Sequence, residues 1–331
     1  MDESFIESSL CEKDIKFETP LRPQSLSEFV GQDSTRSRLE IFTKAALQRN
    51  EALGHVLFCG PPGLGKTSLA HILAKTMGSQ ITVTSGPIIE KPKDLAGILT
   101  NLNFGDILFI DEIHRLNKSV EEYLYPAMED FSLDLIIDSG ANARSVQISI
   151  SPFTLVGATT KAGLLSSPMR SRFGISLRLD YYPAEVLQEI IVRSASILKI
   201  TINPDAALEI AKRSRGTPRI ANNLLRWVRD YGQTNGVKNV DKQLAEKALE
   251  MLCIDDKGLD EMDKKILCTM IDFYSGGPVG LNTLAAAIGE EATTLEEVYE
   301  PFLLIQGFIQ RTPRGRMATE LAYKHLEKNK P

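Results

Sequence analysis

The sequence predicts an α/β fold with a parallel sheet, followed by an all-helical segment and a small C-terminal module of helices and one hairpin. Two patterns predict this organisation. Short apolar runs alternate with helical stretches as far as Tyr182, which is typical of successive βαβ units with helices on both faces of a parallel sheet. From Pro183 the apolar spacing is helical only, until a strand–turn–strand pattern appears near the C-terminus.

The most specific motif runs from Gly60 to Thr67 and reads Gly-Pro-Pro-Gly-Leu-Gly-Lys-Thr. It follows the apolar run Val56–Cys59, which predicts a buried strand, and it opens a predicted helix that ends near Met77. Glycines let the backbone close around phosphate oxygens, Lys66 reaches the terminal phosphates, and the Thr67 hydroxyl can ligate Mg²⁺. In this context the motif indicates a phosphate-binding loop rather than a glycine-rich turn without a ligand.

Four further strands and the helices between them complete the predicted sheet. The strands are expected at Ile81–Thr84, Asp106–Ile110, Phe153–Val156 and Ile175–Leu179. The helices are expected near residues 34–50, 91–102 and 117–130. Two alternating stretches, Phe131–Ile137 and Ser145–Ile150, predict a projecting hairpin with Asp138–Asn142 in its turn.

Polar side chains follow two of these strands. Asp111 and Glu112 come directly after one apolar run, and Thr159 and Thr160 follow another. Because α/β sheets bind ligands at the carboxyl ends of their strands, we expect Asp111 in the Mg²⁺ shell and Glu112 beside the attacking water. The alternative for the acidic pair is two solvated turn carboxylates.

The part of the chain after Pro183 is predicted as helices and one small hairpin. Helices are expected at Ala184–Leu198, Pro204–Arg213, Pro218–Tyr231 and Val240–Met251, and the charged run Asp255–Lys257 looks like a linker. Three more helical stretches, a strand–turn–strand at Gly307–Ala318 and a closing helix at Glu320–Lys328 then suggest a winged-helix module.

The charges of this last module are unevenly distributed. Residues 255–305 hold 3 basic and 11 acidic side chains, whereas residues 306–331 hold 6 basic and 2 acidic ones, a net charge of +4. One basic edge on an acidic module is the electrostatic footprint of contact with nucleic-acid phosphates. The alternative is a solvated turn at the end of the chain.

The composition limits the remaining classes of protein. A chain of 331 residues with a net charge of −5 predicts two or three soluble domains and argues against general coating of nucleic acid. Four widely spaced cysteines favour reduced thiols in a cytosol, without disulfides or a zinc site. No apolar run approaches the ~18 residues of a membrane span, and the start Met1-Asp-Glu is acidic where a secretion signal would be basic. We therefore expect a cytoplasmic protein.

A combination of motifs resembles a known superfamily. Gly60–Thr67, Asp111-Glu112, Thr159-Thr160, Arg172 and Gly216–Arg219 together resemble the AAA+ ATPase pattern. More narrowly, the chain resembles the RuvB family of bacterial Holliday-junction branch-migration motors. This resemblance extends from about residue 20 to 320 and rests on Leu21–Pro23, Phe29–Gln32, Gly60–Thr67, Leu108–Leu116, Gly157–Thr160, Gly216–Asn222 and Arg311–Arg316. The last motif separates the family from clamp loaders and initiators.

The resemblance implies a domain order and a set of partners. It places a flexible arm at residues 1–18, a large AAA+ ATPase domain at 19–182, a small helical lid at 183–254 and a winged-helix DNA-binding head at 255–331. It implies ATP, Mg²⁺ and Holliday-junction or other double-stranded DNA as ligands, in recombination, DNA repair and the SOS response. The expected assembly is a homohexameric ring, with a RuvA-like partner on the hairpin near 131–150 and a RuvC-like resolvase as a further partner.

The resemblance also implies roles for individual residues. The expected catalytic residues are Lys66, Asp111, Glu112, Thr159, Thr160, Arg172 and Arg219. The expected nucleotide contacts are Leu21, Arg22, Gly60, Gly63, Leu64, Gly65, Lys66, Thr67, Ser68, Glu129, Asp130, Phe131, Arg172, Tyr182 and Arg219. Thr67 and Asp111 are expected to ligate the metal, and Arg311, Arg314 and Arg316 to contact DNA.

Several alternatives stay open at this point. Arg172 is expected to act as an arginine finger for a neighbouring subunit, but it could instead pair with a carboxylate of its own domain. The sensor is either Thr159 or Thr160. Ala292 stands where the family often has arginine, which puts one DNA contact in doubt. The leading function is an ATP-driven DNA translocase; a clamp-loader-like switch and a nucleotide-gated winged-helix regulator are the alternatives.

Overall fold

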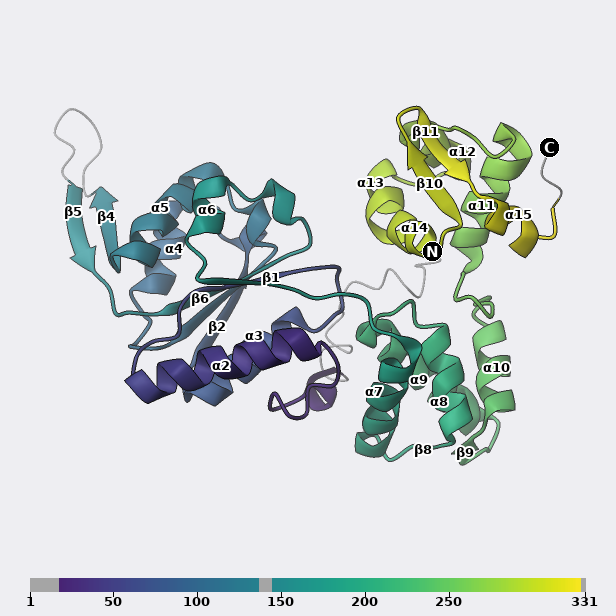
Figure 1. The fold of residues 1–331 in the computed structure, drawn as a ribbon, viewed down its shortest axis with the longest axis horizontal. Helices are drawn as coiled ribbons and strands as arrows, with labels where there is room; N and C mark the ends of the chain where they lie inside the picture. Colours follow the sequence, from purple (N-terminus) through teal and green to yellow (C-terminus); the bar gives the residue numbers. More distant parts are fainter. Residues whose placement is uncertain (1–17, 137–144, 329–331) are drawn as a thin grey trace. The chain divides into compact units, whose positions relative to one another are not determined.

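The computed structural model describes residues 18–136 and 145–328, which form two compact units (Figure 1). Leu21–Tyr182 form the first unit. The residues from Pro183 onward form the second, together with the described residues that precede Leu21. Most of the expected N-terminal arm lies outside the described residues.

A five-stranded parallel sheet forms the centre of the first unit, in the strand order β2-β3-β6-β1-β7. Its strands are β1 (Val56–Cys59), β2 (Ile81–Ser85), β3 (Ile107–Asp111), β6 (Thr154–Thr159) and β7 (Ile175–Arg178). Each predicted strand is present and each neighbouring pair is parallel, so the predicted sheet is confirmed. Since β6 lies between β1 and β3, the carboxyl ends of these three strands meet at one edge.

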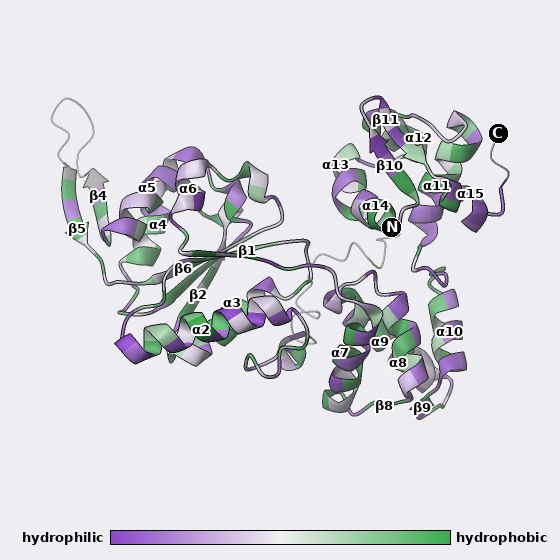
Figure 2. Cartoon of the chain, viewed as in Figure 1, coloured by the Kyte–Doolittle hydropathy of each residue, from purple (hydrophilic) through white to green (hydrophobic). Residues whose placement is uncertain are grey.

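Helices cover both faces of this sheet (Figure 1). On one face lie α2 (Asp33–Arg49) and α3 (Lys66–Met77), and on the other α4 (Pro92–Leu99), α5 (Lys118–Glu129) and α6 (Ser167–Ser171). Short 3-10 turns are η1 (Thr19–Leu21), η2 (Gly86–Ile88), η3 (Ile113–Arg115) and η4 (Ala162–Leu164). The central strands are mainly hydrophobic (Figure 2), as expected for a sheet buried on both faces.

The predicted hairpin projects from the end of the first unit (Figure 1). Its strands β4 (Ser132–Ile136) and β5 (Ser145–Ser149) pair antiparallel, which confirms the hairpin. Its predicted turn, Asp138–Asn142, lies outside the described residues. Two apolar side chains of β5, Val146 and Ile148, are exposed.

The lid is helical, with one small exception. Its helices are α7 (Ala184–Ile197), α8 (Pro204–Lys212), α9 (Pro218–Thr234) and α10 (Lys242–Glu250). Two short strands, β8 (Thr201–Ile202) and β9 (Asn239–Val240), pair in parallel between them. The all-helical prediction was wrong at this point, because a strand of two residues carries no recognisable alternation.

The head has the predicted winged-helix elements. These are α11 (Glu261–Tyr274), α12 (Leu281–Ile288), α13 (Ala292–Thr294), the π-helical turn η5 (Leu295–Tyr299), α14 (Glu300–Ile305), β10 (Ile309–Thr312), β11 (Gly315–Ala318) and α15 (Glu320–His325). The antiparallel pair β10–β11 forms the wing, and Val279 bridges to Arg316 beside it. The last helix ends at His325 rather than at Lys328.

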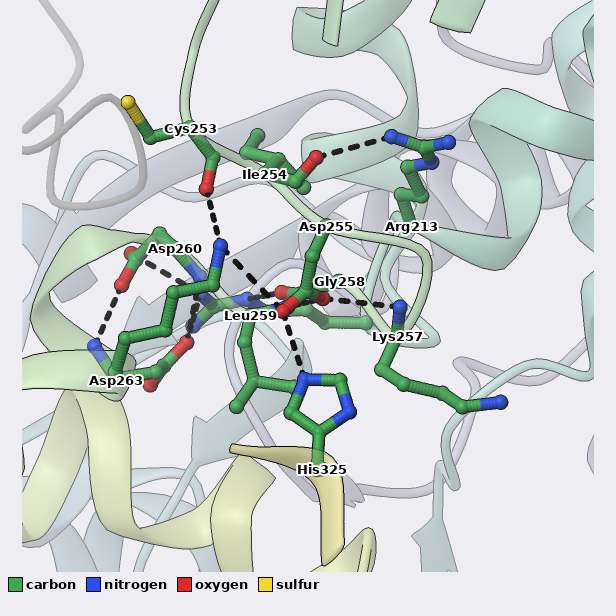
Figure 3. A network of polar contacts seen from close by, with 12 residues as sticks. Arg213, Cys253, Ile254, Asp255, Lys257, Gly258, Leu259, Asp260, Asp263 and His325 are labelled. Carbon is green, nitrogen blue, oxygen red and sulfur yellow. Dashed lines mark hydrogen bonds and ion pairs between the residues drawn. The ribbon is translucent and has the colours of Figure 1, made fainter. Parts of the chain in front are cut away.

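The segment predicted as a linker is held by polar contacts (Figure 3). One carboxylate oxygen of Asp255 accepts the backbone N–H groups of Lys257 and Leu259, each at 3.0 Å. The other oxygen lies 2.9 Å from His325 Nε2 and 3.4 Å from Lys264 Nζ. These partners hold the pKa of Asp255 below its usual range, although burial raises it. The charged run therefore joins α10 to α11 without being a loose linker.

A buried cluster of one guanidinium and two carboxyl groups lies next to this segment. The Arg215 guanidinium, whose side chain is 3% exposed, contacts the carboxylates of Asp260 and Asp263. Asp260 also caps α11, since it accepts the N–H group of Asp263 at 2.8 Å. Burial raises the pKa of Asp263 to about 7, although Arg215 beside it lowers it.

The raised pKa of Asp263 predicts a pH dependence of stability. In the folded chain the Asp263 carboxyl group keeps its proton up to a pH of about 7. In the unfolded chain an aspartate loses its proton near pH ~3.9. The contribution to stability is therefore greatest below pH ~4 and declines as the pH rises through the folded pKa. In thermal unfolding between acidic and mildly basic pH, Asp263→Asn should lack this decline. The exposed control Asp256→Asn should keep it, and an equal decline in Asp263→Asn would contradict the assignment.

Candidate nucleotide and DNA sites

The loop between β1 and α3 can only be built with glycine at its start. Gly60 has φ +142°, and a Cβ added there would lie 2.4 Å from the backbone oxygen of Leu179. Gly63 and Gly65 also have positive φ, of +75° and +98°. A Cβ on Gly65 would lie 3.0 Å from the Phe29 ring, so the Phe29 ring packs directly against the loop. Three glycines with positive φ therefore give the loop the close backbone curve that a phosphate group fits.

The lysine of the motif lies across this cradle. Lys66 begins α3 and is 7% exposed, and its Nζ donates to the carbonyl oxygens of Gly60 and Pro61, each at 2.7 Å. Thr67 and Ser68 follow in the first turn of α3, where backbone N–H groups favour an anion. The Tyr182 hydroxyl donates to the Leu64 carbonyl at 3.3 Å, so Tyr182 also packs against the loop. Burial raises the pKa of Tyr182 far above its usual value.

The sheet register brings the predicted polar residues to the loop. Cys59 pairs with Thr159 at the ends of β1 and β6, and the Gly60 N–H donates to the Thr159 carbonyl at 3.1 Å. Asp111 ends β3 on the other side of β6. Its Oδ1 accepts the N–H group of Glu112 at 2.9 Å. The phosphate loop and the acidic pair therefore share one edge of the sheet.

The two threonines after β6 differ in burial and in their contacts. Thr159 is fully buried; its Oγ1 lies 2.9 Å from His114 Nδ1 and accepts the Lys161 N–H at 3.0 Å. Thr160, in contrast, is exposed at the sheet edge. The Thr159 hydroxyl is thus used within the fold, and the Thr160 hydroxyl is the better placed of the two to meet a nucleotide.

Arg172 lies at the opposite end of β1 from the phosphate loop. The N–H group of Gly174, two residues on, donates to the carbonyl of His55 at 3.0 Å, and His55 precedes β1. The four residues of β1, roughly 13 Å of strand, separate this end from Gly60. Arg172 itself contacts Glu129 Oε2 at 3.0 Å and lies over the Tyr125 ring. In this single chain it makes the intradomain ion pair that was the alternative reading.

The expected nucleotide contacts Glu129, Asp130 and Phe131 lie at this same far end. The Phe131 ring packs edge-on against His55, and Glu129 holds Arg172. The sequence resemblance grouped these residues with Lys66, but the structure does not bring the two sets together within one chain. The remaining expected contacts differ in burial, since Leu21 is buried and Arg22 is only half-buried.

Arg219 lies in the first turn of the second unit's helix α9, directly after Pro218. Its guanidinium lies 3.5 Å from the carboxylate of Glu18 and is partly exposed. Both residues belong to the unit that contains the lid and the head.

The arginines of the wing are already paired with carboxylates. Arg316 makes two contacts with Glu300, at 3.1 and 3.0 Å, and Arg311 Nε lies 2.5 Å from the same carboxylate. Glu300 has no exposed side-chain surface, whereas Glu296, which also contacts Arg311, is half-exposed. Hydrogen bonding to Glu300 raises the pKa of Arg311. Arg314, at the tip of the wing, is exposed.

Three family models cover almost the whole described chain. The Holliday junction DNA helicase RuvB P-loop domain matches residues 21–179, the RuvB AAA lid domain matches 182–255, and the RuvB C-terminal winged helix domain matches 256–327. The chain belongs to the RuvB family.

Individual RuvB proteins agree with this assignment. The chain is 64% identical over 326 residues to the Holliday junction branch migration complex subunit RuvB of Protochlamydia amoebophila, with 98% of each chain covered. It is 61% identical over 318 residues to the subunit of the same name from Flavobacterium psychrophilum, with 96% of this chain and 94% of that one covered. The Thermotoga maritima RuvB Holliday junction branch migration motor superposes with a TM-score of 0.86 at 56% identity, over 94% of this chain and 100% of that one.

The RuvB-family sequence pattern left some supporting residues unassigned. Phe29 under the loop, His114 beside Thr159, and Arg115, which donates to Glu112 Oε2 at 2.8 Å, were quoted only as parts of motifs. Tyr125 under Arg172 carried no signal, because a tyrosine on an amphipathic helix is ordinarily a packing residue. In the described residues, no helix is both long and apolar enough to cross a membrane.

The wing of this RuvB-family chain predicts different outcomes for two neighbouring arginines. Arg314→Ala should lower the slope of log affinity against log salt by about 1 without changing stability, because Arg314 is exposed. Arg316→Ala should destabilise the head by about 3 kcal/mol, the low end for a broken buried pair, because Arg311 stays beside Glu300. Salt-dependent DNA binding and thermal unfolding measure the two effects. Equal stability of both variants would contradict a structural role for Arg316.

Proposed function

We propose that this chain is an ATP-hydrolysing motor that works as a ring of identical subunits and drives branch migration of Holliday junctions. A ring of six is the form that the family resemblance implies. The Holliday-junction substrate is inferred from the names of the relatives. The ring is inferred from the position of Arg172 relative to the phosphate loop.

The separation of Arg172 from its own phosphate loop carries the proposal. Lys66 and Asp111 lie at the carboxyl edge of the sheet, whereas Arg172 lies beyond the amino end of β1. If Arg172 stabilises a γ-phosphate in the transition state, that phosphate must therefore be bound by another subunit. A closed ring supplies one such arginine to every interface, since each subunit offers its loop on one side and its finger on the other.

Each residue of the loop edge has a role in this chemistry. The loop N–H groups and Lys66 bind the β- and γ-phosphates. Thr67 and Asp111 would hold Mg²⁺, which would neutralise negative charge on the phosphate oxygens. Glu112 gives up its hydrogen bond with Arg115 and then orients the attacking water. Thr160 contacts the γ-phosphate, and Arg219 responds to it from the lid. Glu129, Asp130 and Phe131 face the neighbour's nucleotide together with Arg172.

The head and the hairpin supply the proposed partners. Arg314 and the paired Arg311 and Arg316 support contact of the wing with DNA phosphates. The exposed Val146 and Ile148 of β5 support docking of a RuvA-like junction-recognition protein. A RuvC-like resolvase is proposed as a further partner of the same assembly. A clamp-loader-like switch would share the ATP site but not need this wing.

Glu112→Gln and Lys66→Ala test the chemistry of the loop edge. Glu112→Gln should keep ATP binding and lower hydrolysis about 10²-fold or more, because the amide cannot polarise the water. Lys66→Ala should weaken both binding and hydrolysis, because no other charge replaces the ammonium. ATP binding, ATP hydrolysis and migration of a synthetic four-way junction are the measurements. The exposed control Glu122→Gln should behave as the parent; full hydrolysis in Glu112→Gln would reject this assignment.

Mixing two inactive variants tests the shared site. Arg172→Ala should lower hydrolysis by about 10³-fold or more, the usual effect of an arginine finger. Mixed with Lys66→Ala, it should regain part of the activity, because some interfaces then join an intact loop to an intact finger. Arg170→Ala, an exposed neighbour, serves as the control and should stay active. If subunits demonstrably exchange and no activity returns, Arg172 does not act across an interface.

A further inference from the structure

The buried guanidinium of Arg215 joins the lid to the head. Arg215 lies between α8 and α9 with φ +53°. Its side chain contacts residues that follow the lid in the chain. Its Nη2 lies 2.5 Å from Asp263 Oδ2 and 3.0 Å from Asp260 Oδ2. Its Nε donates to the Gly258 carbonyl at 3.1 Å, and its guanidinium carbon lies 4.6 Å from the centre of the Phe302 ring. All of these partners follow the lid in the chain.

A second arginine attaches the start of the connecting segment. Arg213, the C-cap of α8, lies 2.7 Å from the Glu209 carboxylate of that helix. It also donates to the Ile254 carbonyl at 3.0 Å (Figure 3). On the other side of the segment, a Cβ added to Gly258 would lie 3.1 Å from the Arg213 backbone oxygen. The connection therefore packs closely against the end of α8.

This arrangement differs from a hinge. Hinge residues change their backbone angles while the packed parts on either side stay intact. Bending between Ile254 and Asp260 would instead pull a buried guanidinium away from two carboxylates, which leaves charges without partners. It would also break the contacts of Asp255 with His325 and Lys264.

The side chains around Arg215 connect to both the expected nucleotide sensor and the wing. Arg219, the expected nucleotide sensor, follows Arg215 by four residues in one turn. Phe302 lies on α14, whose first residue, Glu300, holds Arg311 and Arg316 of the wing. The sensor and the wing are thus fastened to one set of packed side chains.

We propose that Arg215 is a positioning residue that makes the lid and the head a single lever, which carries nucleotide-driven movement of the lid to the wing. The proposal rests on the proposed function of an ATP-driven DNA motor. A planar guanidinium is required, because it can bridge two carboxylates and a carbonyl while its face lies on an aromatic ring.

Arg215→Lys tests this lever, because it keeps the charge and loses the planar fork. In full-length rings with RuvA on a synthetic four-way junction, ATP hydrolysis without DNA should be unchanged. Junction migrated per ATP hydrolysed should fall about tenfold, within the range found for coupled sites. Lys212→Ala, at the exposed end of α8 and three residues before Arg215, should leave this ratio unchanged.

The rate of tryptic cleavage after the exposed Lys257 measures how tightly the segment between lid and head is held. The parent should be cut slowly there, since the segment is held on both sides, and Arg215→Lys should be cut faster. If Arg215→Lys does not fold, Phe302→Leu, which keeps all the charges, decides the question by the same ratio.

Two results separate this proposal from the proposed function. A parent ring that neither hydrolyses ATP nor moves junctions would reject the motor itself. A working parent, with migration per ATP unchanged in Arg215→Lys, would overturn the lever, and so would a loss of migration that only follows a proportional loss of hydrolysis.

Discussion

The parallel register of β3, β6 and β1 is the constraint on which the nucleotide site depends. It places the ends of the three strands side by side, and the bond from the Gly60 N–H to the Thr159 carbonyl ties the loop to the middle strand. A slip of one residue would turn every side chain of a strand to the other face. Asp111 would then leave the edge that carries Lys66. The buried branched and aromatic residues of these strands prevent such a slip, since each face packs against helices.

The same strands explain why the phosphate loop and Arg172 lie far apart within one chain. The loop leaves the carboxyl end of β1, and the segment with Arg172 returns to its amino end. The contacts of Arg172 with Glu129, the Tyr125 ring and the Pro168 carbonyl hold its side chain in one direction at the surface of the unit. A pre-arranged guanidinium loses less conformational entropy when it meets a phosphate than a mobile one would.

Buried ion pairs organise the second unit in a different way. Glu300 gathers the wing arginines, and Arg215 gathers two acidic residues of the head. Such pairs add little to stability, because desolvation offsets the attraction between the charges, but their geometry is demanding. They therefore define where the wing lies on its helices and how the head attaches to the lid.

The strands, the phosphate loop, the acidic pair at the end of β3 and the wing could all be predicted from the amino-acid sequence, because each depends on a local pattern of apolar spacing, glycine or charge. Tertiary structure alone decided which carboxylates hold Arg172, Arg215 and Arg316, since these contacts join residues far apart in the chain. It also decided that Thr159 is buried and Thr160 exposed, a difference set by where β6 ends against its neighbours. The charged run at Asp255 looked like a linker because local composition records polarity and not the distant His325 that binds it.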